Sequence, residues 1–312
     1  MTILSIVVPC YDEEDVLPET SRRLAGLIDD LIAERLLDAG SAIYFVDDGS
    51  RDRTWDLICD LHKARPERFH GIKLSRNRGH QNALLAGLRH APGDAIISMD
   101  ADLQDDPMVI PDMIRRFQAG CDIVYGVRRA RDSDTRFKRW TARRYYRLLT
   151  GLGVDIVPDH ADFRLMSRRV ITAMAGYGEV NLFVRAIVPL LGFRTDKVFY
   201  DRPSRFAGES KYPLVRMVTL ALDGITSFSM QPLRLITGIG ITVSVIAFLV
   251  GFWAIYIAFV SPRAVPGWAS VVVPVSFIGG LQLLCLGIVG EYIGKIYLET
   301  KRRPIFEIEE TI

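Results

Sequence analysis

Two long segments in the C-terminal third of the chain contain no charged residue. The first covers 26 residues, from Leu235 to Val260, and the second covers 27, from Ala264 to Gly290. A helix needs about 20 apolar residues to cross the hydrocarbon core of a bilayer, so each segment is long enough. Two buried helices of a soluble protein are the alternative, but the paired lengths favour a membrane hairpin. We therefore predict transmembrane helices over about 235–260 and 268–290.

Basic residues lie outside this pair of segments, and only Arg263 lies in the turn that joins them. They are Arg216 and Arg234 before the pair, and Lys295, Lys301, Arg302 and Arg303 after it. Since basic flanks stay on the cytoplasmic side, we predict a multi-pass protein of the inner (plasma) membrane with a cytoplasmic catalytic domain and both termini cytoplasmic. The N-terminal residues lack a basic region and a small-residue cleavage site, and they resemble a first buried strand more than a signal peptide.

The first 130 residues alternate short apolar runs with longer amphipathic ones. The apolar runs predict strands over 3–8, 42–46, 71–74, 95–99 and 122–125, and the amphipathic runs predict helices over 16–37, 54–64, 81–90 and 109–119. This alternation predicts an α/β fold with a mainly parallel sheet covered on both faces. We predict a catalytic domain at 1–212, an amphipathic juxtamembrane segment at 213–232, two membrane helices within 233–296, and a cytoplasmic tail at 297–312.

Composition excludes several classes of protein. The 312 residues carry a formal charge of +2, so the overall charge favours no particular partner, and nucleic acid fits poorly. Cys10, Cys59, Cys121 and Cys285 show no CxxC spacing, which indicates neither a zinc site nor a disulfide framework. The sequence also lacks the glycine-rich GxGxxG and GxxxxGK[ST] loops that bind dinucleotides and nucleoside triphosphates.

Acidic clusters follow three of the predicted strands. They begin at Asp12, Asp47 and Asp100, and the third contains the pair Asp100 and Asp102. Parallel strands collect ligands at their carboxyl ends, so we expect these clusters along one rim of the sheet. An unpaired carboxylate is costly to bury, and paired acids suit Mg²⁺ or Mn²⁺ with open positions for substrate phosphates. The alternative is a solvated, Asp-rich turn.

A basic stretch follows the last predicted strand. Residues 128–147 contain nine Lys or Arg residues, two acids and four aromatic residues. Such a stretch is either a solvated helix face or a surface that meets anionic headgroups or a lipid phosphate.

Four motifs, in this order, resemble those of family 2 glycosyltransferases with the GT-A fold. They are IVVPCYDEE at 6–14, VDDGSRDRT at 46–54, NRG at 77–79 and MDADLQDDP at 99–107. Within this family the chain is most similar to the polyprenyl-phosphate glycosyltransferases, the group that includes bactoprenol glucosyltransferase and dolichol-phosphate mannose synthase. The resemblance covers about residues 3–212, and the predicted hairpin resembles the bacterial membrane-bound branch.

The resemblance implies roles for individual residues. The nucleotide-binding residues that it implies are Pro9, Tyr11, Asp12, Glu14, Asp47, Asp48, Asp100, Ala101 and Gln104. It implies that Asp100 and Asp102 hold a divalent cation on the donor diphosphate, and that Asp162 lies beside the acceptor. Arg128, Arg205 and Lys211 match basic positions that meet substrate phosphates. Asp162, Asp102 and Arg128 are therefore the predicted catalytic residues.

Each of these assignments has a structural alternative. Asp12 and Glu14 could cap the helix that begins near Val16, and Asp12 stands where the family more often has Asn. Asp47 and Asp48 could simply belong to a strand-to-helix turn without a binding role. Asp162 could cap the following segment, and Arg205 and Lys211 could be ordinary loop charges.

The implied reaction is the transfer of a sugar, glucose by preference, from a nucleotide diphosphate sugar to polyprenyl (undecaprenyl) phosphate, with Mg²⁺ or Mn²⁺ and inversion at the anomeric carbon. UDP-glucose is the favoured donor, and GDP-mannose and a modified UDP-arabinose are alternatives. A processive synthase is disfavoured because no QxxRW segment occurs. A catalytically silent, membrane-anchored nucleotide-sugar-binding scaffold is the alternative from another class. A homo-oligomer is a possible assembly.

Overall fold

The computed structural model describes residues 1–128, 160–177, 184–201, 269–301 and 303–312, with a few more between 233 and 249. The chain divides into two compact units. The first contains residues 1–150, 155–213 and 303–312, and the second contains residues 151–154 and 214–302. The predicted site residues outside the membrane segments belong to the first unit, and each unit is considered by itself.

An eight-stranded sheet forms the centre of the first unit, in the order β7-β5-β6-β4-β1-β2-β3-β8. The strands are β1 (Leu4–Cys10), β2 (Ala42–Asp47), β3 (Phe69–Leu74), β4 (Ala95–Ser98), β5 (Ile123–Arg128), β6 (His160–Ser167), β7 (Thr195–Tyr200) and β8 (Ile308–Thr311). Parallel pairing joins β3 to β2, β2 to β1, and β1 to β4, and it also joins β5 to β7. The predicted α/β class and mainly parallel sheet are confirmed.

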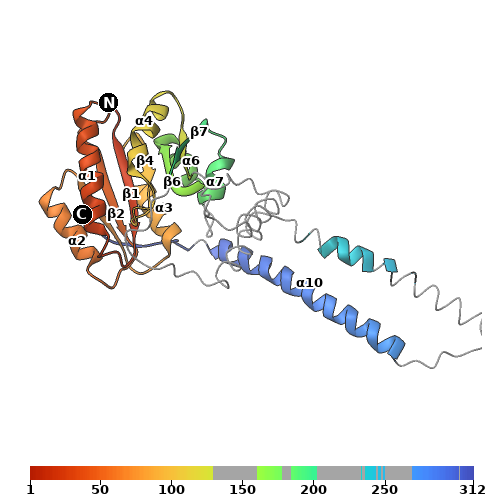
Figure 1. Ribbon diagram of the computed structural model, residues 1–312. Helices are drawn as coiled ribbons and strands as arrows, with labels where there is room; N and C mark the ends of the chain where they lie inside the picture. Colours follow the sequence, from red (N-terminus) through yellow and green to blue (C-terminus); the bar gives the residue numbers. More distant parts are fainter. Residues whose placement is uncertain are drawn as a thin grey trace, which may run out of the picture. The chain divides into compact units, whose positions relative to one another are not determined.

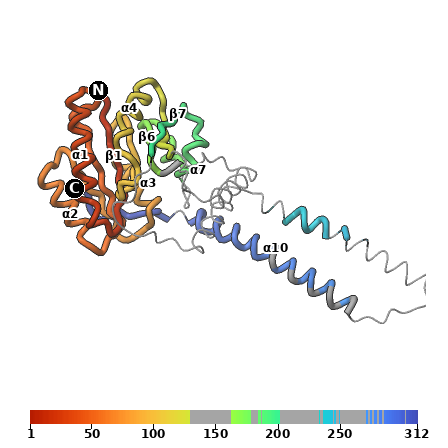
Figure 2. Tube along the Cα trace, viewed as in Figure 1, coloured from red at the N-terminus to blue at the C-terminus, as the bar shows by residue number. Residues whose placement is uncertain are grey.

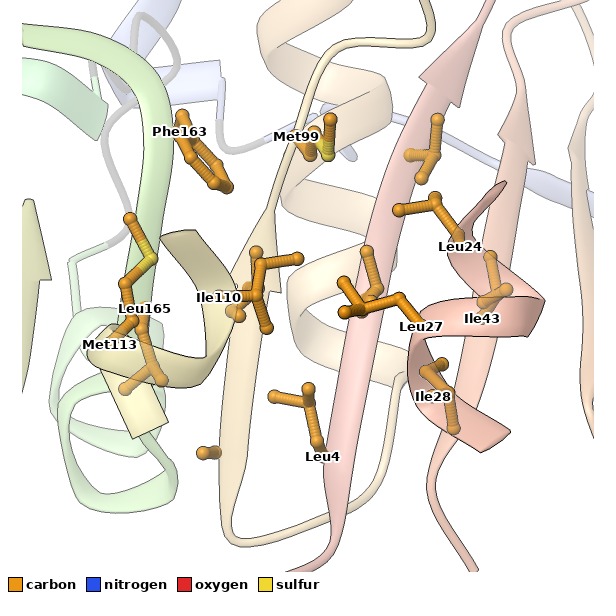
Figure 3. Packing of buried hydrophobic residues seen from close by; sticks show 14 of the residues in the cluster. Leu4, Leu24, Leu27, Ile28, Ile43, Met99, Ile110, Met113, Phe163 and Leu165 are labelled. Atoms are coloured by element: carbon orange, nitrogen blue, oxygen red, sulfur yellow. The ribbon is translucent and has the colours of Figure 1, made fainter. Parts of the chain in front are cut away.

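Helices cover both faces of this sheet (Figure 1). They are α1 (Leu17–Ala33), α2 (Thr54–Ala64), α3 (His80–His90), α4 (Ile110–Gln118), α6 (Arg168–Ala175) and α7 (Val184–Leu190), with a short 3₁₀ turn, η1 (Pro107–Val109), before α4. One face carries α1 and α4. Figure 3 shows Leu24 and Ile28 of α1 and Ile110 of α4 directed at strand residues of this face, such as Leu4. All four side chains are fully buried.

Helix α3 covers the opposite face at very short range. A Cβ atom on Gly87 would lie 2.3 Å from Cγ1 of Val7 and 2.8 Å from Cγ2 of Val46. No real Cβ atom tolerates such contacts, so glycine is required for this helix to pack so close to β1 and β2. Gly87 lies near the end of α3, so the close packing holds the C-terminal half of this helix against the sheet.

Two strands run against the common direction. Strand β6 lies between β4 and β5 and is antiparallel to both. Its first residues therefore reach the rim at which β4 and β5 end. The sequence predicted the strands on either side of β6 but not this insertion, because the pairing of β6 depends on strands that are distant in the sequence.

The C-terminal residues form the other antiparallel strand. Strand β8 pairs with the edge of β3, and the backbones of Gly71 and Ile312 exchange two hydrogen bonds of 3.0 and 2.9 Å. Figure 2 shows the C-terminus beside α2, although the two are far apart in the sequence. We had expected only a tail here. The pairing covers an edge strand that would otherwise offer free backbone groups.

The second unit contains the helix α10 (Ala269–Lys301). Within it, Phe277–Lys301 is long and apolar enough to cross a membrane by length and composition, with a mean hydropathy of 1.5. Among the residues that the structure describes, this is the one such segment. The predicted first membrane helix falls largely outside them, so the hairpin is not confirmed. The predicted domain boundaries stay a prediction.

Candidate active site

The carboxyl ends of β1, β2, β4, β5 and β7 lie at one rim of the sheet, and β6 begins there. The three acidic clusters of the sequence follow β1, β2 and β4. Asp162 lies in β6, two residues before Arg164, which is the register partner of Ser98 at the end of β4. The fold therefore brings the predicted donor and acceptor residues to the same rim.

Asp12 and Glu14 fasten the loop after β1 to the loop after β2. The backbone N–H of Arg51 donates to Oδ1 of Asp12 at 2.8 Å, and that of Arg53 donates to Oε2 of Glu14 at 3.1 Å. Helix α1 has Val16 at its N-cap and no side-chain cap, so the helix-capping alternative is wrong. Asp12 has a φ of 53°, a conformation that is strained for a residue other than glycine.

Asp47 and Asp48, at the end of β2, are buried and hold backbone in place. Oδ1 of Asp47 accepts from the N–H of Ser50 at 3.2 Å, whereas its buried Oδ2 has no hydrogen-bond partner in the described part of the chain. Asp48 accepts from the N–H groups of Arg78 and Gly79 at 2.6 and 2.8 Å. Burial raises the pKa of both carboxyls. Asp48 thus positions the loop that leads into α3.

The turn after β4 presents Asp100 and Asp102. Leu103 adopts a φ of 55°, and the N–H of Gln104 donates to Oδ1 of Asp102 at 3.2 Å. The carbonyl oxygen of Ala101 accepts from the hydroxyl of Thr20 on α1 at 2.7 Å. The turn is therefore attached to the helix layer and is more than a solvated connection.

Asp100 lies in a strongly negative environment. Burial, together with the charges of Asp105, Asp162 and Asp102, raises the pKa of Asp100 to about 6, although His80 acts in the opposite direction. Its buried Oδ1 has no hydrogen-bond partner among the described residues and lies 3.4 Å from Nε2 of His80. The main charges that act on this carboxyl are thus three carboxylates and one imidazole.

Asp162 lies in the opposite environment. Arg164 donates to its Oδ1 at 2.5 Å, and Arg185 donates to both carboxylate oxygens at 3.0 and 2.9 Å. Gln81 donates to Oδ2 at 3.1 Å, and Nε2 of His80 lies 3.5 Å from the same oxygen. Burial alone would raise the pKa of Asp162, but His80 and the two arginines hold it well below its usual value. Asp162 lies within β6, so the helix-capping alternative is wrong.

Arg128, at the end of β5, is held by Asp105 and Tyr200. Its guanidinium donates to Oδ1 of Asp105 at 2.9 Å and to the hydroxyl of Tyr200 at 3.1 Å. The Tyr200 hydroxyl also donates to Asp105. Asp105 is fully buried, and its Oδ2 has no hydrogen-bond partner in the described residues. This triad attaches Arg128 to the acidic turn.

The residues at this rim fit a divalent cation. In the described part of the chain, no group of three or more His, Cys, Asp or Glu side chains could hold a metal ion. Mg²⁺ is usually bound by one or two carboxylates and completed by substrate phosphates and water. Asp100, whose Oδ1 accepts no hydrogen bond from the described residues, and the neighbouring Asp102 supply hard oxygen ligands of this kind.

Sequence reasoning missed several residues of the site. They are His80, Gln81, Arg164, Arg185, Asp105 and Tyr200. His80 directly follows the NRG motif, and Asp105 lies in the acidic run, so their neighbours offered a signal. Arg185 and Tyr200 had none, because α7 and β7 bring them to the site from distant parts of the chain.

Some predicted residues fall outside the described part. Arg205, Lys211, the basic stretch from 129 to 147 and the amphipathic segment 213–232 belong to this group. Their assignments stay predictions, as do the substrate contacts of the other predicted site residues.

Comparisons with known proteins identify the family. The model described as glycosyl transferase family 2 matches residues 5–174, from β1 through α6. The chain belongs to glycosyltransferase family 2. The enzyme accordingly has the GT-A form of the α/β sheet, and the acidic turn after β4 lies within the matched region.

Relatives match this glycosyltransferase over nearly its full length. The uncharacterized glycosyltransferase YkoT of Bacillus subtilis (strain 168) is 50% identical over 98% of this chain and 91% of its own. The bactoprenol glucosyl transferase of Shigella phage SfX is 41% identical over 98% of each chain. The prophage bactoprenol glucosyl transferase homolog of Escherichia coli (strain K12) is 40% identical over 98% of each chain.

Solved structures also resemble the glycosyltransferase. The mannosyltransferase PcManGT from Pyrobaculum calidifontis, in complex with GDP-Man and Mn²⁺, is 16% identical with a TM-score of 0.45, over 95% of this chain and 85% of that chain. Glucosyl-3-phosphoglycerate synthase from Mycobacterium tuberculosis, in complex with Mn²⁺, UDP and phosphoglyceric acid, is 16% identical with a TM-score of 0.45, over 72% and 76% of the two chains.

Proposed function

We propose that this enzyme transfers glucose from UDP-glucose to a polyprenyl phosphate, such as undecaprenyl phosphate, at the cytoplasmic face of the inner membrane. The observation that carries this proposal is the identity of 40–41% to bactoprenol glucosyl transferases over 98% of each chain. That match includes the C-terminal apolar part as well as the catalytic unit. The product is a lipid-phosphate sugar that can supply cell-surface glycans.

On the donor side, the acidic loops bind the nucleotide sugar. Asp100 and Asp102 hold Mg²⁺ or Mn²⁺, which as a Lewis acid stabilises the charge of the departing diphosphate. Arg128, fixed by Asp105, adds a positive charge beside these acids. The nucleotide itself contacts Pro9, Tyr11, Asp12, Glu14, Asp47 and Asp48, together with Ala101 and Gln104 from the turn after β4.

On the acceptor side, little proton removal is required. A phosphate monoester has a second pKa of about 6, so the acceptor is mostly a dianion at neutral pH and is already nucleophilic. Asp162 has a pKa held well below its usual value, which makes it a weak base. We therefore assign it mainly to orienting groups around the acceptor. Direct displacement of the diphosphate inverts the anomeric configuration.

The membrane segment explains how the enzyme meets an acceptor that is confined to a bilayer. Helix α10 contains one segment of sufficient length and apolarity, and we propose that residues 235–260 form its partner in a hairpin. The 213–232 segment then lies at the interface, and Arg205 and Lys211 meet substrate phosphates there.

A donor panel tests this proposal. The purified full-length protein is given UDP-glucose, GDP-mannose or a modified UDP-arabinose, with undecaprenyl phosphate and either Mg²⁺ or Mn²⁺, and the glycolipid is identified by mass spectrometry. UDP-glucose is expected to react fastest, and NMR of the product should show an inverted linkage. Faster transfer from another donor would show that its sugar, and not glucose, is the one transferred. Nucleotide-sugar binding without any turnover would support the scaffold alternative.

A further inference from the structure

Two guanidinium groups meet at one carboxylate. Arg164 and Arg185 both donate hydrogen bonds to Asp162. Arginine remains protonated in proteins, so both contacts are charge-assisted.

The two arginines differ in their access to solvent. The Arg164 side chain is completely buried, and that of Asp162 is 4% exposed. The Arg185 side chain is 37% exposed. Arg185 is therefore the partner of Asp162 that reaches solvent, while Arg164 serves as the internal partner of the carboxylate.

Arg185 is also held in a defined orientation. Its Nε and one terminal nitrogen donate to the two oxygens of Asp162, which is a bidentate contact. The same carboxylate lies 3.5 Å from His80, and His80 lies 3.4 Å from Asp100 of the acidic turn. Asp162 and His80 thus lie between this oriented cationic group and Asp100 of the predicted cation-binding pair.

We propose that Arg185 binds the phosphate of the acceptor and that Asp162 is its positioning residue. Guanidinium groups match the geometry of phosphate oxygens, and an anchored fork loses less conformational entropy on binding than a mobile one. The negative acidic turn and the positive Arg185 group then form neighbouring subsites for the donor with its cation and for the anionic acceptor. This inference rests on the proposed function.

Steady-state kinetics of the full-length protein test the assignment, with UDP-glucose and a soluble C15 polyprenyl monophosphate as probes. Loss of a hydrogen bond to a charged group corresponds to roughly a tenfold change in affinity or more, so Arg185→Ala should raise the KM for the lipid phosphate at least tenfold. The KM for UDP-glucose should stay within about twofold of wild type. Arg185→Lys, which keeps the charge but not the fork, should give an intermediate KM for the lipid phosphate.

Arg115→Ala is the matched control, because Arg115 is 59% exposed on α4 and pairs only locally with Asp112. Arg185→Ala should fold, since Asp162 keeps its buried partner Arg164, and equal thermal midpoints and UDP affinities would verify this. An unchanged KM for the lipid phosphate, or an equal rise in both KM values, would overturn the inference. Failure of the proposed function is distinct, because the wild type itself would then form no glycolipid.

Discussion

Asp100 and Asp162 lie on either side of the same imidazole, yet their surroundings are opposite. Asp100 has neighbouring carboxylates and an oxygen without a hydrogen-bond partner among the described residues, and its pKa rises to about 6. Asp162 is held by two arginines, and its pKa falls well below the usual value. Carboxylates at one rim can therefore have different roles. Asp100 has mainly acidic neighbours, whereas Asp162 is paired with two arginines.

Replacing the cation-binding acids should have the largest effect. We expect Asp102→Asn to lower kcat about a thousandfold, because the charge that develops on the leaving diphosphate loses several kcal/mol of stabilisation. Glycolipid formation measures this effect, and removal of divalent ions with EDTA should reproduce it in the wild type. Asp112→Asn, on the exposed surface of α4, is the control. Full activity of Asp102→Asn would remove the acidic turn from the mechanism.

Removing Asp162 should affect stability more than the chemistry. Asp162→Ala leaves the fully buried Arg164 without its carboxylate, which we expect to lower the free energy of unfolding by about 3–5 kcal/mol. Urea denaturation measures this loss. Asp112→Ala, which breaks an exposed pair, should change the same quantity by less than about 1 kcal/mol. Equal stabilities of the two variants would contradict the structural role of the buried pair between Asp162 and Arg164.

Asp162→Asn separates orientation from base catalysis. Because the pKa of Asp162 is low, we expect this variant to keep measurable turnover between pH 6 and 9, reduced about tenfold through poorer orientation of Arg185. A pH–rate profile gives the answer. Activity that is lost at every pH, while fold and acceptor affinity persist, would instead identify Asp162 as an essential base.

Asp105→Asn tests whether Arg128 belongs to the donor subsite. The variant removes the buried charge that holds Arg128, so the KM for UDP-glucose should rise about tenfold while the KM for the lipid phosphate changes little. Asp106→Asn is a close control, since asparagine also caps η1 well. A rise in the KM for the lipid phosphate alone would assign Arg128 to the acceptor subsite.

The smallest expected effect is that of Asp100→Asn, which should stabilise the protein, whereas Asp162→Ala should destabilise it. The folded-state pKa of Asp100, about 6, exceeds the unfolded value of about 3.9, so the folded protein binds more protons between these values. Its free energy of unfolding therefore falls as the pH rises through this window. In EDTA at pH 7.5, Asp100→Asn should raise the thermal midpoint by roughly 2–5 °C, and this difference should shrink towards pH 4. A lower midpoint at pH 7.5 would show that Asp100 is not destabilised in the metal-free protein.

Local pattern was sufficient for the first half of the sheet. Strands and helices between residues 3 and 128 formed close to their predicted limits, because each apolar run is bounded by a clear turn or helix signal. Strands β6, β7 and β8 were not predicted, since their pairing depends on partners that are distant in sequence. The acidic residues were predicted because they directly follow the predicted strands in the sequence. Arg185 was not predicted, because no local pattern marks it.

The sequence by itself determined the α/β class, the family and the acids that follow the strands, because strand periodicity and short motifs are local properties of the chain. Only the tertiary structure decided how those acids are charged. The insertion of β6 between β4 and β5 places Asp162 beside Arg164, and α7 supplies Arg185, whereas Asp100 lies among carboxylates and His80. The electrostatic environment of a carboxylate depends on neighbours within a few ångströms, and the fold selects those neighbours from anywhere in the sequence.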